Sequence, residues 1–479
     1  MDDAFQRQLN DRIPLAMATL ELFDFAFDEA MLEALYERHR GRCYTDTLTF
    51  PDLLRLVRDC LLQHGGSGRR LFTELGRRRR DDAEPPVDRS NFYRKLSRMP
   101  VAASRALLRT CTARLAEVMP PLPAVLLPGC FDDFDVVVID GKKVKNAAKR
   151  LKPTRGYSSG KLLGAKALVA MHARTGLALA MNDSLDGEAN DVPLVGELLP
   201  QVREVIPARP VLWLADRQFC DVATFAKLGE RPGDRFVVRV RNGLTFQAES
   251  TRTLVDDQGR TVVDEVGTFG KGKDAMRLRR VTLVRDDGQD DDDVVLLTDL
   301  LDDKQFDATD LLKLYRKRWG IEQMFQQVTE TFALQHLIGC TPRAVLFQLA
   351  LCLLMYNLIQ VVKNYVAEDG RVAVSIVSTY GLFYDLKREL HAWAYLGGGG
   401  GGGGSGSGSS GPLPGGRCRD HGQMRDRLRE LLNGSWDPVA YTKASDKTPR
   451  KKKPPPRPIP GGHTSVQRLL KAANDPRAK

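Results

Sequence analysis

Apolar residues recur at spacings of three and four along the first 120 positions, which is the pattern of amphipathic helices. The pattern is clearest at residues 28–39, 50–64 and 100–119. Between the last two lies SNFYRKLSRM at 90–99, whose hydroxyl, amide and basic side chains suit contacts to the backbone of a nucleic acid duplex. A solvated basic loop is the alternative interpretation. The pattern predicts a helical N-terminal DNA-binding domain over residues 1–125.

The pattern changes near residue 130, where short runs of apolar residues replace the helical spacing. Runs typical of β-strands lie at 134–140, 165–173, 177–183, 211–215 and 235–240, and helical stretches follow the third and fourth of them. This order predicts an α/β domain over residues 130–395, built on a mixed five-stranded sheet with helices on both faces. Residues 241–305 alternate and are rich in turn residues, which predicts an inserted antiparallel β unit.

A long helix is expected after the β insertion, capped by Asp310 and running to Phe332. The apolar stretch that follows, at 344–362, is long enough to span a membrane. It is interrupted by amide side chains at positions 348, 357 and 360. We therefore expect a buried core helix and no membrane partner.

The C-terminal part differs in composition from the rest of the chain. Residues 397–411 are a Gly/Ser linker. Residues 412–479 are basic and proline-rich, and we expect this tail to be largely disordered apart from one helical stretch at 422–433. Sixteen of the basic and six of the acidic residues lie between positions 417 and 479, so the tail carries +10 of the formal net charge of +11. An argument for nucleic acid binding by the body must therefore rest on local clusters.

Cysteine and histidine usage narrows the chemistry and the compartment. The eight cysteines are scattered without a CxxC pair, which indicates a reducing compartment. The seven histidines form no metal-binding array, so a zinc site is not expected. The polar, acidic start MDDAFQRQLNDR argues against a secretory signal. We expect a cytoplasmic, nucleoid-associated protein.

Three acidic residues carry the candidate chemistry. Asp140 and Asp216 each follow an apolar strand, and these two strands are expected to be neighbours in the sheet. Two adjacent carboxylates repel each other, and a divalent cation relieves the repulsion. Glu322 lies on the long helix with Tyr315 and Arg318 at helical spacing on the same face. Asp140, Asp216 and Glu322 are therefore predicted to be catalytic residues that hold Mg²⁺, with Mn²⁺ as a substitute, for two-metal phosphoryl transfer. Two strand-end turns capped by aspartates are the alternative.

Basic residues cluster next to Asp140. Nine Lys and Arg residues lie between Asp140 and Lys166 without another acidic residue, which suits a polyanionic substrate. The residues predicted to contact DNA are Tyr315, Arg318, Lys142, Lys143, Arg155 and Lys161. A solvated charged loop is again the alternative.

These motifs together resemble the DDE transposases of the IS4 type. The resemblance rests on VVVIDGKKV at 136–144, WLADRQFCD at 213–221, LLTDL at 296–300 and YRKRWGIEQMFQQ at 315–327. The family's signature helix has Tyr, Arg, Glu and Lys at fixed spacing. Tyr315, Arg318 and Glu322 match it, whereas Thr329 stands where the family has Lys.

The resemblance implies a ribonuclease H-like core and Mg²⁺-dependent cleavage of transposon ends, followed by joining of those ends to target DNA. It further implies double-stranded DNA with terminal inverted repeats as the partner, and a homodimer in the synaptic complex. A hairpin intermediate stays open, because residues 218–317 contain no Trp and offer Phe246 and Phe269 instead. Trp319 is expected to be a packing residue. A catalytically inactive DNA-binding protein and a structure-directed nuclease on the same core remain as alternatives.

Overall fold

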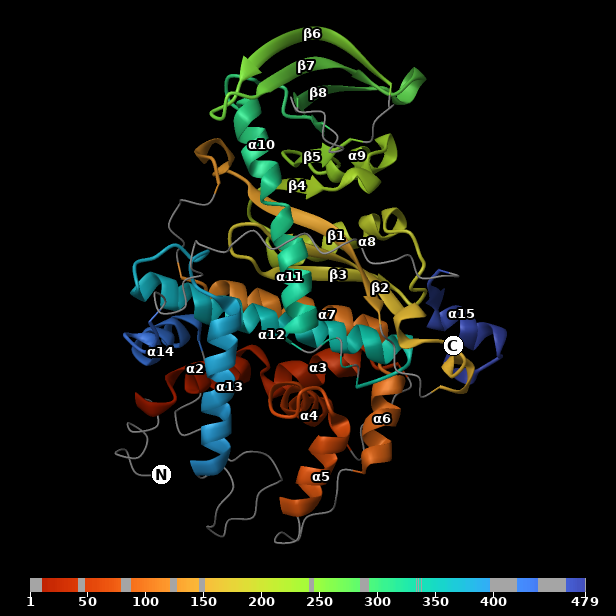
Figure 1. The fold of residues 1–479 in the computed structure, drawn as a ribbon, viewed down its shortest axis with the longest axis vertical. Helices are drawn as coiled ribbons and strands as arrows, with labels where there is room; N and C mark the ends of the chain where they lie inside the picture. Colours follow the sequence, from red (N-terminus) through yellow and green to blue (C-terminus); the bar gives the residue numbers. More distant parts are fainter. Residues whose placement is uncertain are drawn as a thin grey trace.

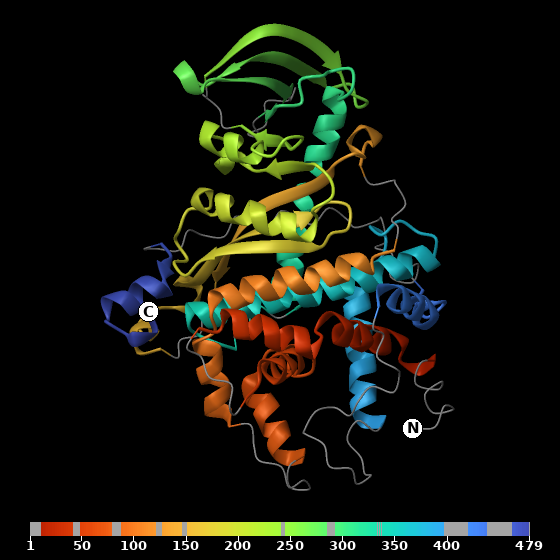
Figure 2. The ribbon, with the colours of Figure 1, turned by 180° about the vertical axis from the view of Figure 1, so that it is seen from behind.

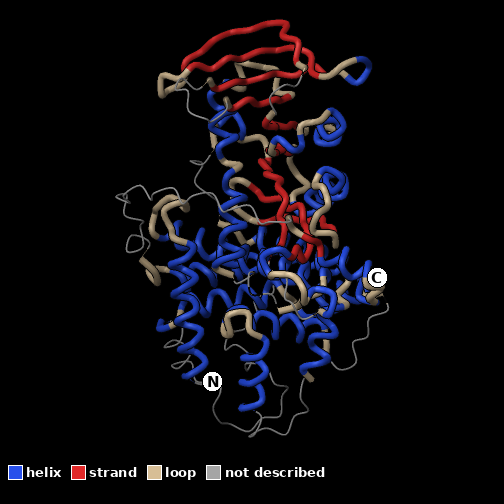
Figure 3. The backbone as a smooth tube through the Cα atoms, turned by 45° about the vertical axis from the view of Figure 1, so that its right-hand side comes forward, coloured by secondary structure: helices blue, strands red, loops and turns tan. Residues whose placement is uncertain are grey.

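The computed structural model describes residues 11–41, 48–78, 88–120, 127–145, 151–240, 245–284, 293–332, 334, 336, 338–396, 420–437 and 462–478. The sheet occupies one half of an elongated molecule, and most of the helices gather in the other half (Figures 1 and 3). The molecule is a mixed α/β structure, in agreement with the expected fold class. The Gly/Ser linker expected at 397–411 lies outside the described residues.

The N-terminal part forms helices, in agreement with the apolar spacing. They are α2 (Pro14–Ala26), α3 (Glu29–His39), α4 (Phe50–Leu62), α5 (Gly68–Arg78), α6 (Arg89–Ser97) and α7 (Val101–Glu117). Side chains that accept from backbone amides begin several of them: Asp28 caps α3, Thr49 caps α4 and Asp88 caps α6. α7 packs against β3 and α12, so these helices lie directly against the sheet-bearing part of the chain.

The centre of the sheet contains the five strands that the sequence predicted. These are β1 (Asp135–Lys145), β2 (Leu162–His172), β3 (Ala178–Ser184), β4 (Val211–Ala215) and β5 (Arg235–Arg239). They lie in the order β3-β2-β1-β4-β5, with β1, β2 and β3 antiparallel and with β4 and β5 parallel to β1. Their apolar residues are buried on both faces, as the continuous apolar runs require.

The five predicted strands are only part of the sheet, which has ten strands among the described residues. The insertion is antiparallel, as expected, but it continues the central sheet: β9 (Val294–Thr298) pairs with β5 and then with β8 (Met276–Leu283). β7 (Thr261–Phe269) and β6 (Phe246–Val255) follow in order. The continuity has a simple cause, since β9 supplies the backbone groups that the edge of β5 needs.

Helices cover both faces of the central strands. α8 (Val195–Val205) packs on β2 and β3, and α9 (Val222–Leu228) packs on β5. These two helices are in front when the molecule is seen from behind (Figure 2). On the opposite face, α10 (Ala308–Arg316) and α11 (Trp319–Glu330) run from the insertion down to the helical half (Figure 1). The sequence predicted one long helix capped by Asp310. The structure has two, separated at Lys317–Arg318, and the capping side chain is that of Asp307.

α12 (Pro342–Asp369) is the central core helix, and α13 (Thr379–Leu396) packs beside it. The apolar window that could cross a membrane by its length and composition is entirely buried inside the protein. Its amides are used internally. Asn357 bonds the backbone of Ala178 and the hydroxyl of Thr112, and Gln348 accepts from the amide of Ile338. The expected buried core helix is thus what the structure contains.

The tail was predicted to be largely disordered apart from one helix, and the structure describes residues 420–437 and 462–478 of it, which contain two α-helices and a short strand. α14 (His421–Leu432) confirms the helical stretch and packs against α2 and α12. β10 (Thr464–Ser465) joins the edge of β2 in parallel, and α15 (Val466–Ala472) covers the same end of β2. Val466 and Leu470 are fully buried there, and Arg468 is paired with Asp186 and Glu188. Tertiary contacts that no local pattern reveals stabilise this segment.

Candidate active site

The register of two parallel strands places the first two acidic residues side by side. Ile139 on β1 pairs with Ala215 on β4, and Asp140 and Asp216 are the residues that follow this pair. Parallel neighbours lie about 4.8 Å apart, so both carboxylates emerge at one place on the sheet. β4 ends at Ala215 as predicted, whereas β1 continues past Asp140 to Lys145 because β2 still pairs with it there.

Each of these aspartates is held by a backbone amide. Asp140 Oδ1 accepts from the amide of Gly141 at 2.8 Å, and Asp216 Oδ1 accepts from the amide of Arg217 at 2.7 Å. Burial raises the pKa of Asp140 to about 6. The Gly141 amide and the Arg318 charge act in the opposite direction, while the negative charges of Asp216 and Glu322 add to the rise. The cluster is therefore a place of mutual carboxylate repulsion.

Arg318 links the third acidic residue to this pair. Its Nη2 donates to Glu322 Oε1 at 2.8 Å, and its Nη1 lies 3.7 Å from Asp140 Oδ2. The guanidinium is largely buried, with 12% of its side chain exposed, while 35% of the Glu322 side chain is exposed. The break between α10 and α11 puts Arg318 at the first position before α11, where its side chain can reach β1.

Tyr315 joins α10 to the end of β4. Its hydroxyl donates to the carbonyl oxygen of Ala215 at 3.3 Å, directly before Asp216. The side chain is buried, and burial raises the pKa of Tyr315, so the phenol stays protonated and able to donate. The structure thus brings together Asp140, Asp216, Tyr315, Arg318 and Glu322.

The acidic residues are close, but a guanidinium occupies the space between them. Over the ranges that the structure describes, no three His, Cys, Asp or Glu side chains converge tightly enough to enclose a metal ion. The donor chemistry nevertheless fits a hard divalent cation, because all three side chains offer carboxylate oxygens and one of them is desolvated.

The four other predicted DNA contacts fall into different places. Lys142 lies on the same face of β1 as Asp140, but its ammonium donates to α11, to Phe325 O at 3.3 Å and to Thr329 Oγ1 at 2.9 Å. Burial lowers the pKa of Lys142 to about 8. Lys143 is exposed on the opposite face of β1. Lys142 is therefore not the freely solvated cation that the sequence suggested.

Arg155 and Lys161 lie away from the acidic residues. Lys161 directly precedes β2, whose Leu163 pairs with Lys145. Lys145 is five residue steps along β1 from Asp140, roughly 16 Å at about 3.3 Å per step. Arg155 is exposed at the end of a short turn in the same loop. The intervening basic residues at 146–150 lie outside the described residues.

The glycine after Asp140 has a steric role that sequence reasoning missed. A Cβ on Gly141 would lie 2.4 Å from the Asp191 carboxylate oxygens. Asp191 is buried and pairs with Lys166 at 2.8 Å, so another of the nine expected substrate-facing cations is used inside the protein. The available sign in the sequence was the glycine placed between Asp140 and the lysines at 142 and 143.

Trp319 was expected to pack, and the structure corrects this. Its side chain is 57% exposed at the first position of α11, beside Arg318. In contrast, Trp213 on β4 is fully buried. An exposed aromatic side chain therefore follows Arg318 directly in the chain, and the polar neighbours of Trp319 in RKRWG were the available sign of exposure.

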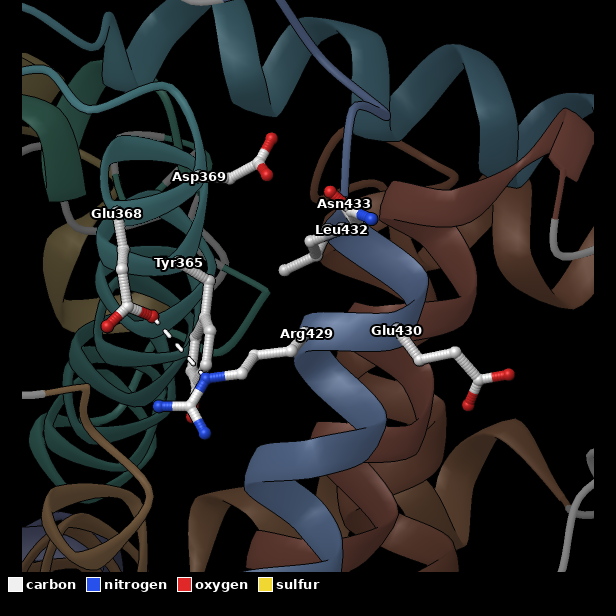
Figure 4. A pocket seen from close by; sticks show the side chains of 7 residues that line it. All are labelled: Tyr365, Glu368, Asp369, Arg429, Glu430, Leu432 and Asn433. Carbon is white, nitrogen blue, oxygen red and sulfur yellow. Dashed lines mark ion pairs between the residues drawn. The ribbon is translucent and has the colours of Figure 1, made fainter.

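One cavity lies elsewhere in the described part of the molecule. It has a volume of about 440 Å³ and lies between α12 and α14, with Tyr365, Glu368 and Asp369 on one side and Arg429 and Asn433 on the other (Figure 4). Its Arg429 is 3.6 Å from Glu368, and Asp369 accepts from the amide of Gly434. These pairs join the tail helix to the core, so the cavity belongs to a packing interface and not to the acidic cluster.

Comparison with known protein families shows which family the segment around the site resembles. Residues 132–358 match the family model of the transposase DDE domain. This segment is a transposase DDE domain. It holds Asp140, Asp216, Tyr315, Arg318 and Glu322, and it spans β1 through most of α12. The expected resemblance to the DDE transposases is thereby confirmed over this segment, which is a little under half of the chain.

Individual relatives of the DDE domain are distant. A Sinorhizobium fredii protein named "Putative transposase y4zB" is 26% identical over 155 residues, which cover 31% of this chain and 42% of that relative. The chain thus spans less than half the length of that curated relative. A solved piggyBac transposase synaptic complex with hairpin DNA aligns over 90% of this chain and 88% of its own, at 12% identity and a TM-score of 0.39, too low to carry an argument.

Proposed function

We propose that the chain is a DNA transposase of the IS4 type, which cleaves transposon ends and joins them to target DNA. Asp140, Asp216 and Glu322 are the catalytic carboxylates of this proposal, on a central sheet that we interpret as ribonuclease H-like from its order β3-β2-β1-β4-β5. The observation that carries the proposal is the single Arg318 guanidinium, which lies against both Glu322 and Asp140 beside the end of β4. Asp140 and Glu322, which contact this guanidinium, come from distant parts of the chain, and Asp216 follows the strand paired with β1.

The three carboxylates are the residues that would hold Mg²⁺, or Mn²⁺ in its place. Their repulsion supports this role, since the charges of Asp216 and Glu322 raise the pKa of Asp140 and a cation would remove that penalty. When bound, the metal supplies activation of the attacking oxygen and stabilisation of the leaving oxygen in phosphoryl transfer. Arg318 contributes a fixed positive charge for the phosphate, and Tyr315 holds the end of β4 through Ala215.

Binding of double-stranded DNA is assigned to basic residues of both halves, of which Lys161 is half-buried and the others are exposed. Lys143, Arg155 and Lys161 lie along the β1–β2 hairpin, and Arg89 and Arg94 project from α6. Such cations neutralise phosphates without reading sequence. The partners in this proposal are terminal inverted repeats and target DNA, bound by a homodimer in the cytoplasm, in association with the nucleoid.

Cleavage of a labelled DNA end with and without Mg²⁺ tests the proposal. Asp140→Asn, Asp216→Asn and Glu322→Gln are expected to abolish strand cleavage while DNA binding survives, because each removes one carboxylate charge and little volume. Asp133→Asn and Glu330→Gln are the matched controls, since both side chains are exposed and Glu330 lies on the same helix as Glu322. Full cleavage by any of the three carboxylate variants would overturn the assignment.

The same assay separates the alternatives. Cleaved ends that never appear joined to target DNA would favour a structure-directed nuclease. Binding without cleavage under any metal condition would favour an inactive DNA-binding protein. Joined products that depend on all three carboxylates are the result expected for a transposase.

A further inference from the structure

α11 is tied to β1 near both of its ends by a cationic side chain, Arg318 at its start and Lys142 near its end. At its start, Arg318 on the helix side reaches Asp140 on the strand. Near its end, Lys142 on the strand reaches the helix, with its ammonium 3.3 Å from Phe325 O and 2.9 Å from Thr329 Oγ1. Asp140 and Lys142 are two residues apart, so they share one face of the strand. Glu322 lies between the two ties.

The second tie is built into the local geometry of the helix. Thr329 Oγ1 donates to Phe325 O at 2.7 Å, so the hydroxyl keeps a lone pair directed at the Lys142 ammonium. The ammonium also lies 5.2 Å from the centre of the Phe325 ring, in a cation–π arrangement. A positive charge near the carbonyl end of a helix is favourable in itself. Carbonyl, hydroxyl and ring together fix where this ammonium can lie.

We propose that Lys142 is a positioning residue, which sets the register and rotation of α11 on β1 and thereby the placement of Glu322 relative to Asp140. The importance of that placement rests on the proposed function, in which both carboxylates are catalytic. The existence of the contact between Lys142 and α11 does not depend on the proposed function. Its partners are internal, so Lys142 acts through α11 and not through a phosphate.

Loss of the tie is expected to change the chemistry and not the binding of DNA. Lys142→Met keeps the length and apolar stem of the side chain but removes every hydrogen bond of the ammonium. The helix then keeps a single tie, at Arg318, and Glu322 can swing about it. Misplacement of a reacting group by about 1 Å can lower a rate roughly 100-fold. We expect a 10- to 100-fold loss of cleavage rate on this basis.

The test compares Lys142→Met, Lys142→Arg and the control Lys227→Met, whose lysine is exposed near the end of α9. DNA binding is measured in EDTA, and cleavage is measured as a function of Mg²⁺ concentration. We expect Lys142→Met to raise the half-saturating Mg²⁺ concentration and to leave DNA affinity within about twofold, with Lys142→Arg in between because it keeps a donor. Lys227→Met should match the parent chain in every measurement.

Thr329→Val supplies a readout that needs no catalysis. It keeps the branched shape of the residue and removes the hydroxyl, so its effect on the thermal unfolding midpoint should shrink when Lys142 is already Met. Non-additive shifts of the two single variants and the double variant are the expected result. Additive shifts would show that the tie does not exist and would overturn the inference.

Two further outcomes are decisive. If Lys142→Met weakens DNA binding and leaves the Mg²⁺ dependence unchanged, Lys142 is a phosphate contact and the inference is wrong. If the parent chain cleaves no DNA end, the proposed function fails, while the thermal comparison still decides whether Lys142 fixes α11 on β1. Exchanging the two residues tests the same contact. Thr329→Lys places a second ammonium against Lys142 and should lower the thermal unfolding midpoint. Adding Lys142→Thr to that variant should restore part of the lost midpoint.

Discussion

Tyr315 donates its hydroxyl to the carbonyl oxygen of Ala215, the last residue of β4, over 3.3 Å. The bond joins α10 to the strand that presents Asp216 as its next residue. Asp216 is also held by the amide of Arg217. The position of this carboxylate is therefore determined from both sides, by its own turn and by a helix that follows a hundred residues later in the chain.

Tyr315→Phe removes that hydroxyl and little else. The Ala215 carbonyl then lacks its partner in a buried setting, so we expect the free energy of unfolding to fall by about 0.5–1.5 kcal/mol. The rate of DNA cleavage should fall by more than the loss of folded protein alone would cause, because the turn at Asp216 loses the hydrogen bond that supports it. Denaturant unfolding and the cleavage assay measure the two effects. Tyr380→Phe, at a side chain that is 69% exposed, is the control. Unchanged cleavage in Tyr315→Phe would contradict this reasoning.

Trp319→Ala tests the exposed aromatic side chain that follows Arg318 in the chain. Because the side chain is 57% exposed, its loss should change stability by no more than about 0.5 kcal/mol. If Trp319 stacks on a DNA base, its loss should weaken binding of an end with unpaired bases by about 1–3 kcal/mol. Fluorescence anisotropy with paired and unpaired ends measures the difference. Tyr384→Ala on α13, with 54% exposure, should leave both affinities unchanged. Equal losses on both ends would argue against stacking.

Glu389 on α13 gives the stability a pH dependence of known sign. Burial raises the pKa of Glu389 to about 7, against the lowering effect of the Ala16 amide, which donates to it at 2.8 Å. The folded chain therefore binds this proton more tightly than the unfolded chain does. The resulting stability is fully present below about pH 4.5 and is lost as the pH rises to about 7. At about 1.4 kcal/mol per unit of pKa difference, the loss is at most about 3–4 kcal/mol.

Glu389→Gln should remove this dependence. The variant is expected to gain stability relative to the parent chain at pH 8 and to gain little at pH 5. Urea unfolding at both pH values, with the exposed Glu330→Gln as the control, measures it. The same pH slope in parent and variant would show that Glu389 is not the group responsible.

Arg279 is the buried link between the β insertion and the chain that leads into α10. Its guanidinium is fully buried, pairs with Asp264 at 2.8 Å and donates to Phe306 O at 2.7 Å. Arg279→Leu leaves the Asp264 carboxylate with Arg252 as its remaining described ionic partner, so we expect a loss of about 3–5 kcal/mol. Arg277→Leu, on the same strand and exposed, should cost less than about 1 kcal/mol. Similar losses for the two variants would refute the argument.

Local pattern was sufficient for the parts of the site that strands position. The apolar runs before Asp140 and Asp216 predicted both the strands and their adjacency, and β1 and β4 do pair. Helical spacing placed Tyr315, Arg318 and Glu322 together, although the helix breaks at Lys317. The break was not foreseen because Lys and Arg are good helix formers, and the only local sign of it is Gly320, a poor helix former two residues after Arg318.

Tertiary contacts decided what the local pattern could not. Lys142, Lys143 and Lys166 are alike in sequence, yet the first bonds α11, the second is exposed and the third pairs with Asp191. Alternation along β1 separates Lys142 from Lys143, but the acceptors belong to residues far away in the chain. For the same reason, nothing in the composition of the tail predicted β10, whose partner strand lies three hundred residues earlier.

That late strand has a consequence for synthesis of the protein. Thr464 and Ser465 pair with Leu162 and Leu163, and the amide of Ser465 donates to Glu188. During synthesis, β2 leaves the ribosome long before residues 464–465 are made. The edge of β2 at Leu162 and Leu163 therefore has no partner strand for most of the elongation of the chain. Such edges recruit other strands. A truncated mRNA that ends after α14 would therefore give a polypeptide that keeps its acidic cluster but leaves this edge of β2 unpaired. Chaperones would have to cover that edge to prevent aggregation.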